Sequence, residues 1–257
     1  MPPKSDTYSI FTITDNIHFV QGAASNWTVL TSGTRFTLVD SGYPNDYKAL
    51  IQSLRDLKLD PKDCMAVLLT HAHIDHVGGA LQLRQDFGTP IWCHQKEERN
   101  LTGAAREQVA PKTIYKKLWN LRILFWAVHA IKLGGTQSFS TNPDVIFNSD
   151  PSLDLPGRPQ PIVTPGHTSG HTSYLISSDS GKVIITGDAL VSKHPTSWKR
   201  TGRQMLPNMF HATPDQAEAT YLNWNITPET IILPGHGPIL TSRLETEKIT
   251  ATRETRT

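Results

Sequence analysis

The sequence predicts a single α/β domain spanning residues 1–257. Apolar runs of strand length alternate with segments of helical periodicity along the chain, as in layered α/β folds. A length of 257 residues fits one large domain better than two small ones. Hydrophobic residues make up 37% and charged residues 19%, which excludes a disordered chain. The strand-rich halves suggest two strand layers covered by helices, and other α/β orders stay open at this point.

The first half reads as strands, then alternating helices and strands. β-branched and aromatic runs between Gly and Ser turns predict strands at 17–20, 27–31, 35–39, 65–70 and 90–93. The run at 65–70 is continuously apolar, which is typical of a strand buried on both faces. Helical spacing predicts helices at 44–57 and 77–87.

The middle of the chain predicts a helical insertion at about 97–140. Its apolar positions recur at steps of three and four: Ile114, Leu118, Leu121, Phe125, Val128 and Ile131. Gly134 and Gly135 end the pattern. Three interpretations stay open: an ordinary packed helix, a lid over a site, or a dimer or membrane-surface contact. As a lid, its aromatic residues would suit a bulky or acyl-bearing substrate. The candidate pocket residues are Trp119, Phe125, Trp126, Trp198, Met205, Met209 and Phe210.

Strands return after Pro143, at 145–147, 161–164, 172–177, 183–186 and 231–233. A helix is predicted over 214–224, with Thr213 as its N-cap and Pro214 at the first helical position. The charged tail after Ser242 is expected to be a short helix or a frayed end.

Charge and composition exclude several classes of function. A net charge of +2, with no Lys/Arg block before the tail, argues against a nucleic-acid partner. The first ten residues contain no signal-peptide core, and no apolar stretch reaches about 18 residues. A cytoplasmic location with no integral membrane segment is therefore expected. Cys64 and Cys93 form neither a CxxC pair nor a disulfide framework, and are interpreted as buried small hydrophobes.

The strongest chemical signal is the segment Thr70-His71-Ala72-His73-Ile74-Asp75-His76. It places four potential metal ligands directly after the buried strand at 65–70. Two His side chains two positions apart on an extended turn can share one metal, and the next Asp and His can face a second. Imidazole and carboxylate are both zinc ligands. A solvated His-rich turn, or a helix cap by Asp75, is the alternative.

Three further candidates also follow predicted strands. His167 lies on a Pro-Gly turn after 161–164, Asp188 follows 183–186, and His236 follows 231–233 between two Gly residues. A lone Gly-Asp is weak evidence because turns use it freely. Four clusters of ligand-type residues at strand ends are, however, difficult to explain as ordinary loops.

The order HxHxDH, then a strand-end His, Asp and His, resembles the metallo-β-lactamase superfamily. The segment Leu38-Val39-Asp40-Ser41-Gly42 is similar to an early Asp motif of that family. The resemblance covers roughly Ile17 to Leu240. It implies an αββα sandwich, in which two mixed sheets lie between helices and metals bind at one edge.

The resemblance also implies a role for each motif residue. His71, His73 and His167 would bind a first metal, Asp75, His76 and His236 a second, and Asp188 would bridge both; Asp75 and Asp188 are the candidate catalytic carboxylates. Asp40 would orient ligands rather than bind metal, with a simple turn acid as the alternative. His171 is a weaker candidate for the same orienting role, with a core histidine as the alternative.

These roles predict a hydrolase with two zinc ions, with iron or manganese as alternatives. A metal-bridging hydroxide would attack the carbonyl of a small-molecule ester, lactone or thioester. Asp at 188 with no nearby Cys favours the glyoxalase, lactonase and thioesterase branches over true β-lactamases. A tyrosine common in lactonases is missing from 189–192. Hydrolysis of β-lactams or phosphodiesters, an iron persulfide dioxygenase and a non-enzymatic metal-dependent binding protein remain alternatives, and a homodimer stays open.

Overall fold

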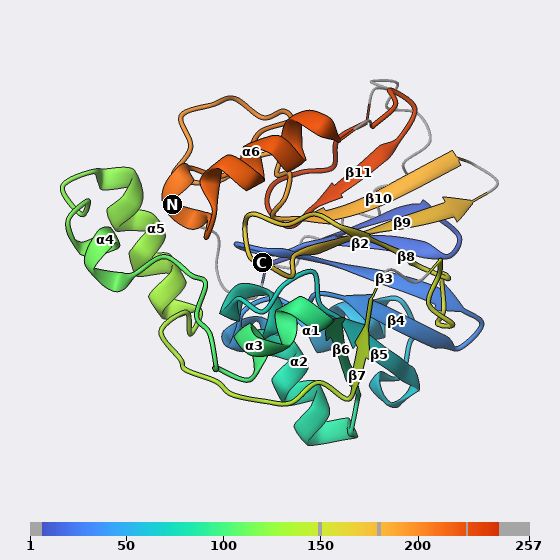
Figure 1. Cartoon of the computed structure of the whole chain (residues 1–257). Helices are drawn as coiled ribbons and strands as arrows, with labels where there is room; N and C mark the ends of the chain where they lie inside the picture. Colours follow the sequence, from blue (N-terminus) through green and yellow to red (C-terminus); the bar gives the residue numbers. More distant parts are fainter. Residues whose placement is uncertain (1–6, 149–150, 179–180, 225, 242–257) are drawn as a thin grey trace.

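The computed structural model of the chain describes residues 7–148, 151–178, 181–224 and 226–241 (Figure 1). One sheet contains, in spatial order, β1 (Ser9–Thr14), β2 (Ile17–Gln21), β3 (Asn26–Ser32), β4 (Arg35–Val39), β5 (Cys64–Leu68), β6 (Ile91–His94) and β7 (Val145–Phe147). The other contains β11 (Ile231–Pro234), β10 (Gly181–Gly187), β9 (Thr172–Ser178) and β8 (Gln160–Val163). Both sheets are mixed. In the first, β1 to β4 pair antiparallel and β4 to β7 pair parallel. In the second, β10 and β11 pair parallel, and the other pairs are antiparallel.

The α-helices are α1 (Tyr47–Asp56), α2 (Ile74–Phe87), α3 (Glu98–Leu101), α4 (Pro111–Tyr115), α5 (Leu121–Lys132) and α6 (Pro214–Asn223). Short 3₁₀ turns are η1 (Pro44–Asp46), η2 (Pro61–Asp63), η3 (Gln95–Glu97) and η4 (Asn208–Phe210). Within the described ranges, no helix combines the length and the apolarity needed to cross a bilayer.

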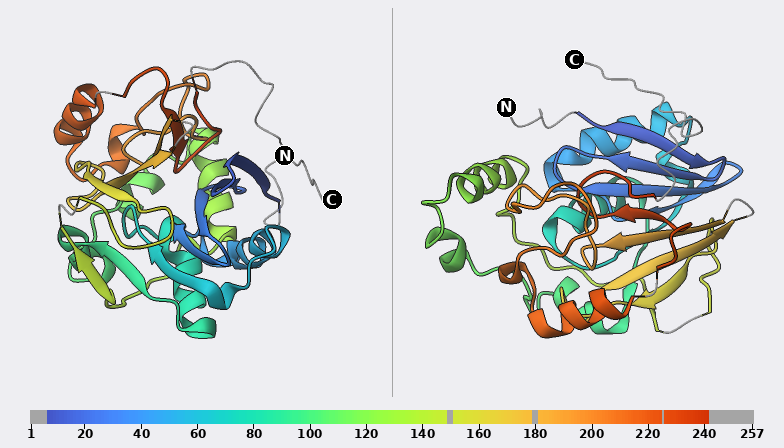
Figure 2. Two further views of the ribbon diagram at one scale, coloured as in Figure 1. Left: turned by 90° about the vertical axis from the view of Figure 1, so that its right-hand side faces the viewer. Right: turned by 90° about the horizontal axis from the view of Figure 1, so that it is seen from above.

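Neighbouring residues of the central strands alternate between two cores, as a strand's two-residue period requires. In β3, Val29 packs with α1 and α2 on the outer face, whereas Leu30 packs between the sheets. Tyr174 and Ile185 meet Leu30's cluster from the second sheet. On the far side of that sheet, Ile184 packs with Tyr221 of α6. The layers therefore run helix, sheet, sheet, helix, which confirms the predicted αββα sandwich (Figures 1 and 2).

Several element ends differ from the sequence predictions by one to three residues, and one strand was missed. β1 was not predicted, because its sequence SIFTIT mixes Ser and Thr with apolar residues and no side chain in it is fully buried. α2 begins at Ile74 rather than Val77, with His73 as its N-cap. α6 has Thr213 as its N-cap position and begins at Pro214, as predicted, although the Thr213 side chain makes no capping hydrogen bond. The tail beyond Ser242 lies outside the described residues.

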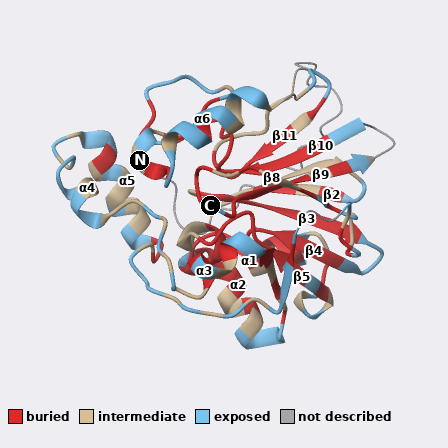
Figure 3. Ribbon diagram, in the orientation of Figure 1, coloured by how far each residue is buried: buried red, intermediate tan, exposed pale blue. Residues whose placement is uncertain are grey.

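The helical insertion is present, but it is not one packed helix. α3, α4 and α5 are separate, since Gly103 takes a positive φ of 76° and Asn120 caps a new helix by accepting a hydrogen bond from the amide of Arg122. The predicted apolar stripe mostly faces outward: Phe125 is 65% exposed and Ile131 57%. Figure 3 shows α4 and α5 largely unburied, projecting from the sandwich.

The four strands that precede the candidate ligands end at one edge of the sandwich. β5 leads to His71, β8 to His167, β10 to Asp188 and β11 to His236. Because β10 and β11 are parallel neighbours, Asp188 and His236 emerge side by side. The sheet topology therefore brings four residues that are far apart in the sequence to the same edge of the sandwich.

Candidate metal centre

The HxHxDH segment bends from a loop into a helix. His73 is extended, with φ −84° and ψ 152°, and Asp75 and His76 lie in the first turn of α2. His71 and His73 therefore point from the loop, while Asp75 and His76 point from the helix. The positive end of the helix dipole favours the Asp75 carboxylate at this position.

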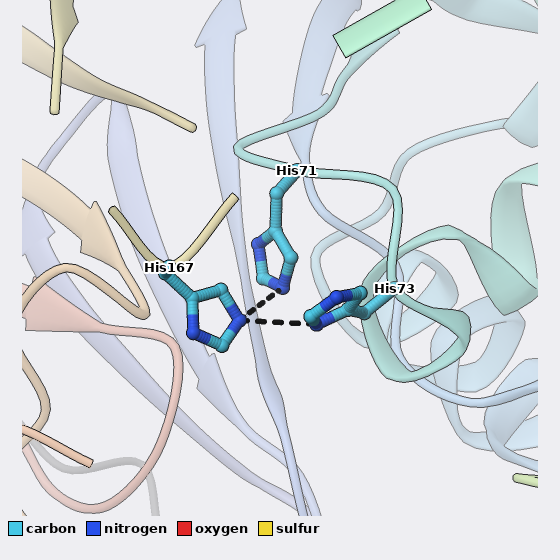
Figure 4. A group of neighbouring side chains, drawn as sticks. All are labelled: His71, His73 and His167. Atoms are coloured by element: carbon cyan, nitrogen blue, oxygen red, sulfur yellow. Dashed lines mark hydrogen bonds between the residues drawn. The ribbon is translucent and has the colours of Figure 1, made fainter. Parts of the chain in front are cut away.

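His71, His73 and His167 form a first group of converging nitrogens (Figure 4). Nε2 of His167 lies 3.2 Å from Nε2 of His71 and 3.0 Å from Nδ1 of His73. Three imidazole nitrogens at such mutual distances can bind one cation at the 2.0–2.1 Å typical of zinc.

Asp75, His76 and His236 form a second group on the other side of Asp188. Oδ2 of Asp75 lies 3.8 Å from Nε2 of His76 and 3.4 Å from Nε2 of His236. His76 and His236 are buried, and their rings meet nearly edge to face.

Asp188 stands between the two groups and offers one oxygen to each. Its Oδ2 lies 3.4 Å from Nε2 of His167 and 4.0 Å from Nε2 of His71. Its Oδ1 lies 3.5 Å from Nε2 of His76 and 3.4 Å from Nε2 of His236. The structure thus brings the seven candidate side chains together, with the Asp188 carboxylate between the two groups that the family resemblance implies.

Hydrogen bonds hold four imidazoles with the second ring nitrogen turned away from the centre. Each donates from that nitrogen to a fixed acceptor: His71 to Thr70 Oγ1 (3.0 Å), His73 to the Glu107 carbonyl (2.7 Å), His76 to Asp40 Oδ2 (2.8 Å) and His236 to the Ala24 carbonyl (2.7 Å). Metal-binding histidines are oriented in this way, since the bond fixes the tautomer and leaves the inner nitrogen free to coordinate.

Asp40 holds Thr70 and His76 from behind by hydrogen bonds and belongs to neither group. Its Oδ1 accepts the Thr70 amide at 2.8 Å, and its Oδ2 accepts the Thr70 hydroxyl and His76 Nδ1, each at 2.8 Å. To do so it adopts a left-handed φ of 59°, a conformation that is uncommon outside glycine but that Asp and Asn tolerate best.

Several buried atoms of the centre lack a hydrogen-bond partner among the described residues. They include Nε2 of His76 and Oδ1 of Asp188. Leaving a buried polar atom unsatisfied costs about 1–3 kcal/mol, more for a charged group. A cation between these two atoms would satisfy both, so the donor set fits a bound metal.

The charges of the centre also favour a cation. Burial lowers the pKa of His71 and His167 well below the ordinary value. Burial acts in the same direction on His76, but Asp40, Asp188 and Asp75 outweigh it and raise the His76 pKa to about 9. Burial would raise the Asp188 pKa, yet His236 and His76 hold it well below its usual range. The buried carboxylates therefore stabilise a positive charge at the second group.

His171 lies outside both groups and supports Asp188. It is fully buried, its Nδ1 donates to Thr164 Oγ1 at 2.8 Å, and its Nε2 accepts the Asp188 amide at 3.0 Å. Gly235 packs beside the same carboxylate, and a Cβ there would lie 2.5 Å from Asp188 Oδ1. Both contacts restrict where the shared carboxylate can sit.

A cavity of about 170 Å³ adjoins the second group. His236 forms part of its wall, together with Tyr43, Trp126, His129 and His194. Of the predicted pocket residues, only Trp126 lines this cavity. Phe210 packs against Trp126, with their ring centroids 5.1 Å apart. Trp119, Phe125 and Trp198 are 82%, 65% and 75% exposed and do not line it, and neither do Met205 and Met209.

Sequence reasoning missed four residues around the centre. Tyr43 and His129 lie in no recognisable motif, and His194 packs on His236 with ring centroids 5.2 Å apart. Glu97 is buried and joins two ligand loops, because its carboxylate accepts the Ala72 amide and the Thr168 hydroxyl. Only His194 had a usable signal, as a histidine shortly after the Asp188 motif.

The sequence matches the family model described as the metallo-β-lactamase superfamily over residues 20–236. The chain is 30% identical over 206 residues to hydroxyacylglutathione hydrolase GloC of Haemophilus influenzae, covering 79% of this chain and 81% of that protein. It is 26% identical over 181 residues to the probable metallo-hydrolase YflN of Bacillus subtilis, covering 69% and 61%.

Solved structures agree on the fold. The subclass B3 metallo-β-lactamase BJP-1 of Bradyrhizobium japonicum superposes with a TM-score of 0.65 at 18% identity, covering 90% of this chain and 79% of that one. The B3 metallo-β-lactamase BLEG-1 gives a TM-score of 0.58 at 23% identity, with 92% and 94% covered. Sequence and fold lead to the same conclusion: the chain belongs to the metallo-β-lactamase superfamily and is a metal-dependent hydrolase.

Proposed function

We propose that this chain is a di-zinc hydrolase that cleaves the acyl bond of a thioester, or of a related ester or lactone. The observation that carries the proposal is the position of Asp188. Its two oxygens face two separate ligand groups, each at 3.4–4.0 Å from the nearest nitrogens. A carboxylate held in this way suits a pair of cations rather than one.

The donor types support zinc. The seven side chains offer imidazole nitrogen and carboxylate oxygen, and Cys64 and Cys93 lie in β5 and β6, in the core between the first sheet and its helices. Zinc accepts this donor set, and so do iron and manganese. A zinc pair, when bound, supplies Lewis acidity and lowers the pKa of a bound water to about 7.

The residues of the chain then have three tasks. Asp40 and His171 hold the His76 ring and the Asp188 backbone in place. The cavity beside His236 receives the acyl part of the substrate, and Trp126 provides an apolar wall for it. The burial of His71 and His76 keeps bulk water from the ligands, which strengthens electrostatic interactions there.

The relatives favour a thioester within the carbonyl class. The Haemophilus protein, similar over four fifths of both chains, is named as a hydroxyacylglutathione hydrolase, and such a substrate is a thioester. The β-lactamase structures are under 25% identical and support the fold alone. The seven ligands are all present, which favours an enzyme over a binding protein.

The test combines metal analysis with turnover. Purified chain would be stripped by a chelator, reloaded with zinc, iron or manganese, and assayed with a hydroxyacyl-glutathione thioester, an aryl ester, a lactone, a cephalosporin and an aryl phosphodiester. We expect two zinc ions per chain and the highest kcat/KM for the thioester, abolished by the chelator. One iron ion per chain would indicate the oxygenase alternative. Metal binding without any turnover would indicate the non-enzymatic binding protein.

A pair of variants makes the assay specific. Asp188→Asn keeps the shape of the side chain but removes its charge, so zinc content should fall below two and turnover by at least about 100-fold. Asp154→Asn makes the same chemical change at an exposed site and should change neither. Full turnover with two zincs in Asp188→Asn would show that Asp188 does not bridge.

A further inference from the structure

The projecting α4–α5 segment exposes apolar side chains that the sandwich does not use. Leu121, Phe125 and Val128 follow each other along one side of α5 and are 63%, 65% and 42% exposed. Trp119 precedes them at 82% exposure and Ile131 follows. The opposite side of α5 carries Ile123 into the interior and Trp126 to the cavity. α5 is therefore apolar on both sides, and the side through Phe125 stays exposed among the described residues.

A second segment, distant in sequence, extends the same surface. The guanidinium of Arg122 stacks 4.1 Å from the ring centroid of Trp198, and its Nη1 donates to the Ser197 carbonyl at 3.4 Å. Trp198 is 75% exposed. Of the twelve large hydrophobic side chains exposed in the described part of the chain, seven belong to these two segments: Tyr115, Trp119, Leu121, Phe125, Val128, Ile131 and Trp198. Their clustering is the feature that needs an explanation.

The charge of the two segments is one-sided. Residues 111–132 and 198–203 contain eight of the 25 Lys and Arg residues and none of the 23 Asp and Glu residues. The rest of the chain therefore has 17 cations against 23 acids. All eight cations are exposed: Lys112, Lys116, Lys117, Arg122, Lys132, Lys199, Arg200 and Arg203. We call the exposed side chains of these two linked segments, the eight cations and the seven hydrophobics, the basic apolar face.

We propose that the basic apolar face docks onto the surface of an anionic phospholipid bilayer. Tryptophan, phenylalanine and leucine side chains enter the boundary between headgroups and acyl chains, and Lys and Arg bind lipid phosphates. Each cation near such a surface contributes on the order of 1 kcal/mol. A nucleic acid would match the charge but not the aliphatic stripe of α5. In a symmetric dimer through this face, the eight cations of one copy would face the eight of the other, and their repulsion opposes such a dimer.

Docking would hold the bilayer against the helix that also walls the cavity. Trp126, His129 and Ala130 of α5 line the cavity beside His236, while Leu121 and Phe125 of the same helix lie in the basic apolar face. The proposal does not depend on which acyl bond the centre cleaves.

The experiment is flotation of the zinc-loaded full chain with vesicles of phosphatidylcholine alone or with 30% phosphatidylglycerol. We expect binding to the anionic vesicles, weakened by salt, and little to the neutral ones. Two double variants separate the contributions without adding charge: Leu121→Gln with Phe125→Gln removes apolar contacts, and Lys116→Gln with Lys117→Gln removes cations. Each should lower the partition coefficient at least tenfold.

Matched controls change the same residue types elsewhere. Leu222→Gln, at a 71% exposed position on α6, and Lys48→Gln with Lys62→Gln should stay within twofold of the wild type. Thermal unfolding verifies that every variant is folded. The proposal is overturned if the wild type ignores anionic vesicles, or if the α4–α5 variants bind them as well as the wild type. It is equally overturned if light scattering shows a dimer that Leu121→Gln with Phe125→Gln dissociates, or if the face binds RNA more tightly than vesicles.

Discussion

Asp40 Oδ2 accepts a hydrogen bond of 2.8 Å from Nδ1 of His76, and Asp40 takes a left-handed backbone conformation to make it. The bond keeps one proton on the outer nitrogen of His76. The inner nitrogen, Nε2, is left facing Asp75 and Asp188 with no hydrogen-bond partner in the described chain. A residue that binds no metal in our proposal therefore determines what one of the ligands can bind.

Asp40→Asn tests this relationship. Asn also tolerates a φ of 59°, so the substitution changes the hydrogen bonds and not the backbone. Loss of the carboxylate should weaken zinc binding by about 10–100-fold, as for other partners of ligating histidines. Competition with a chromophoric chelator measures this affinity, with Asp154→Asn as the surface control. Zinc affinity equal to wild type in Asp40→Asn would contradict the assigned role.

Gly235→Ala tests whether the space beside Asp188 matters. The added Cβ would lie 2.5 Å from Asp188 Oδ1 and 2.9 Å from His76 Cε1, so the carboxylate must move. We expect zinc content to fall below two per chain and kcat to fall at least tenfold. Gly33→Ala is the contrast: its positive φ of 64° makes the change strained, but nothing lies within 4 Å of the new Cβ. That variant should lose stability and keep both zincs.

Trp126→Ala tests the cavity wall. Trp126 lines the cavity and packs on Phe210 and His194. Removing it should raise KM for an acyl substrate by about five- to tenfold, with kcat within about twofold, since the contact binds substrate and transition state alike. Trp119→Ala, at an 82% exposed position outside the cavity, should leave both constants unchanged. Equal changes in KM for Trp126→Ala and Trp119→Ala would contradict the role of Trp126 as a wall of the substrate cavity.

The pH dependence of stability can be tested away from the metal centre, at His94. Burial, and secondly the nearby Lys96, lower the His94 pKa below its ordinary 6.5. Below pH 6.5 the unfolded chain therefore takes up a proton before the folded one, and stability falls as pH falls. His94→Asn keeps an acceptor for the Lys96 amide but cannot titrate. Between pH 7 and pH 5, urea midpoints of the metal-free protein should fall less in this variant than in the wild type. Parallel curves would show that His94 titrates alike in both states.

The strands and the candidate ligand residues could be predicted because both leave strong local patterns, whereas the αββα order of the layers was implied only by the family resemblance. His71, His167, Asp188 and His236 each follow an apolar strand, and strands of one sandwich end at common edges. The apolar alternation that divides Val29 from Leu30 is equally local. Such patterns depend on short spacings, which the sequence contains directly.

The surroundings of the centre could not be predicted, because they depend on contacts between distant segments. Glu97 reaches Ala72 and Thr168 across 25 and 71 positions, and no spacing rule marks it. The stripe through Phe125 shows the same limit: periodicity identified an apolar helix face but not whether that face meets the core, the cavity or solvent. Trp119 and Trp126 look alike in the sequence, and only the fold separates them.

Anomalous diffraction at the zinc edge, from crystals of the zinc-loaded chain, tests the central claim most directly. Our account predicts two peaks on opposite sides of the Asp188 carboxylate. One should be bound by His71, His73 and His167, and the other by Asp75, His76 and His236. A single peak, or a pair that Asp188 does not touch, would contradict the account.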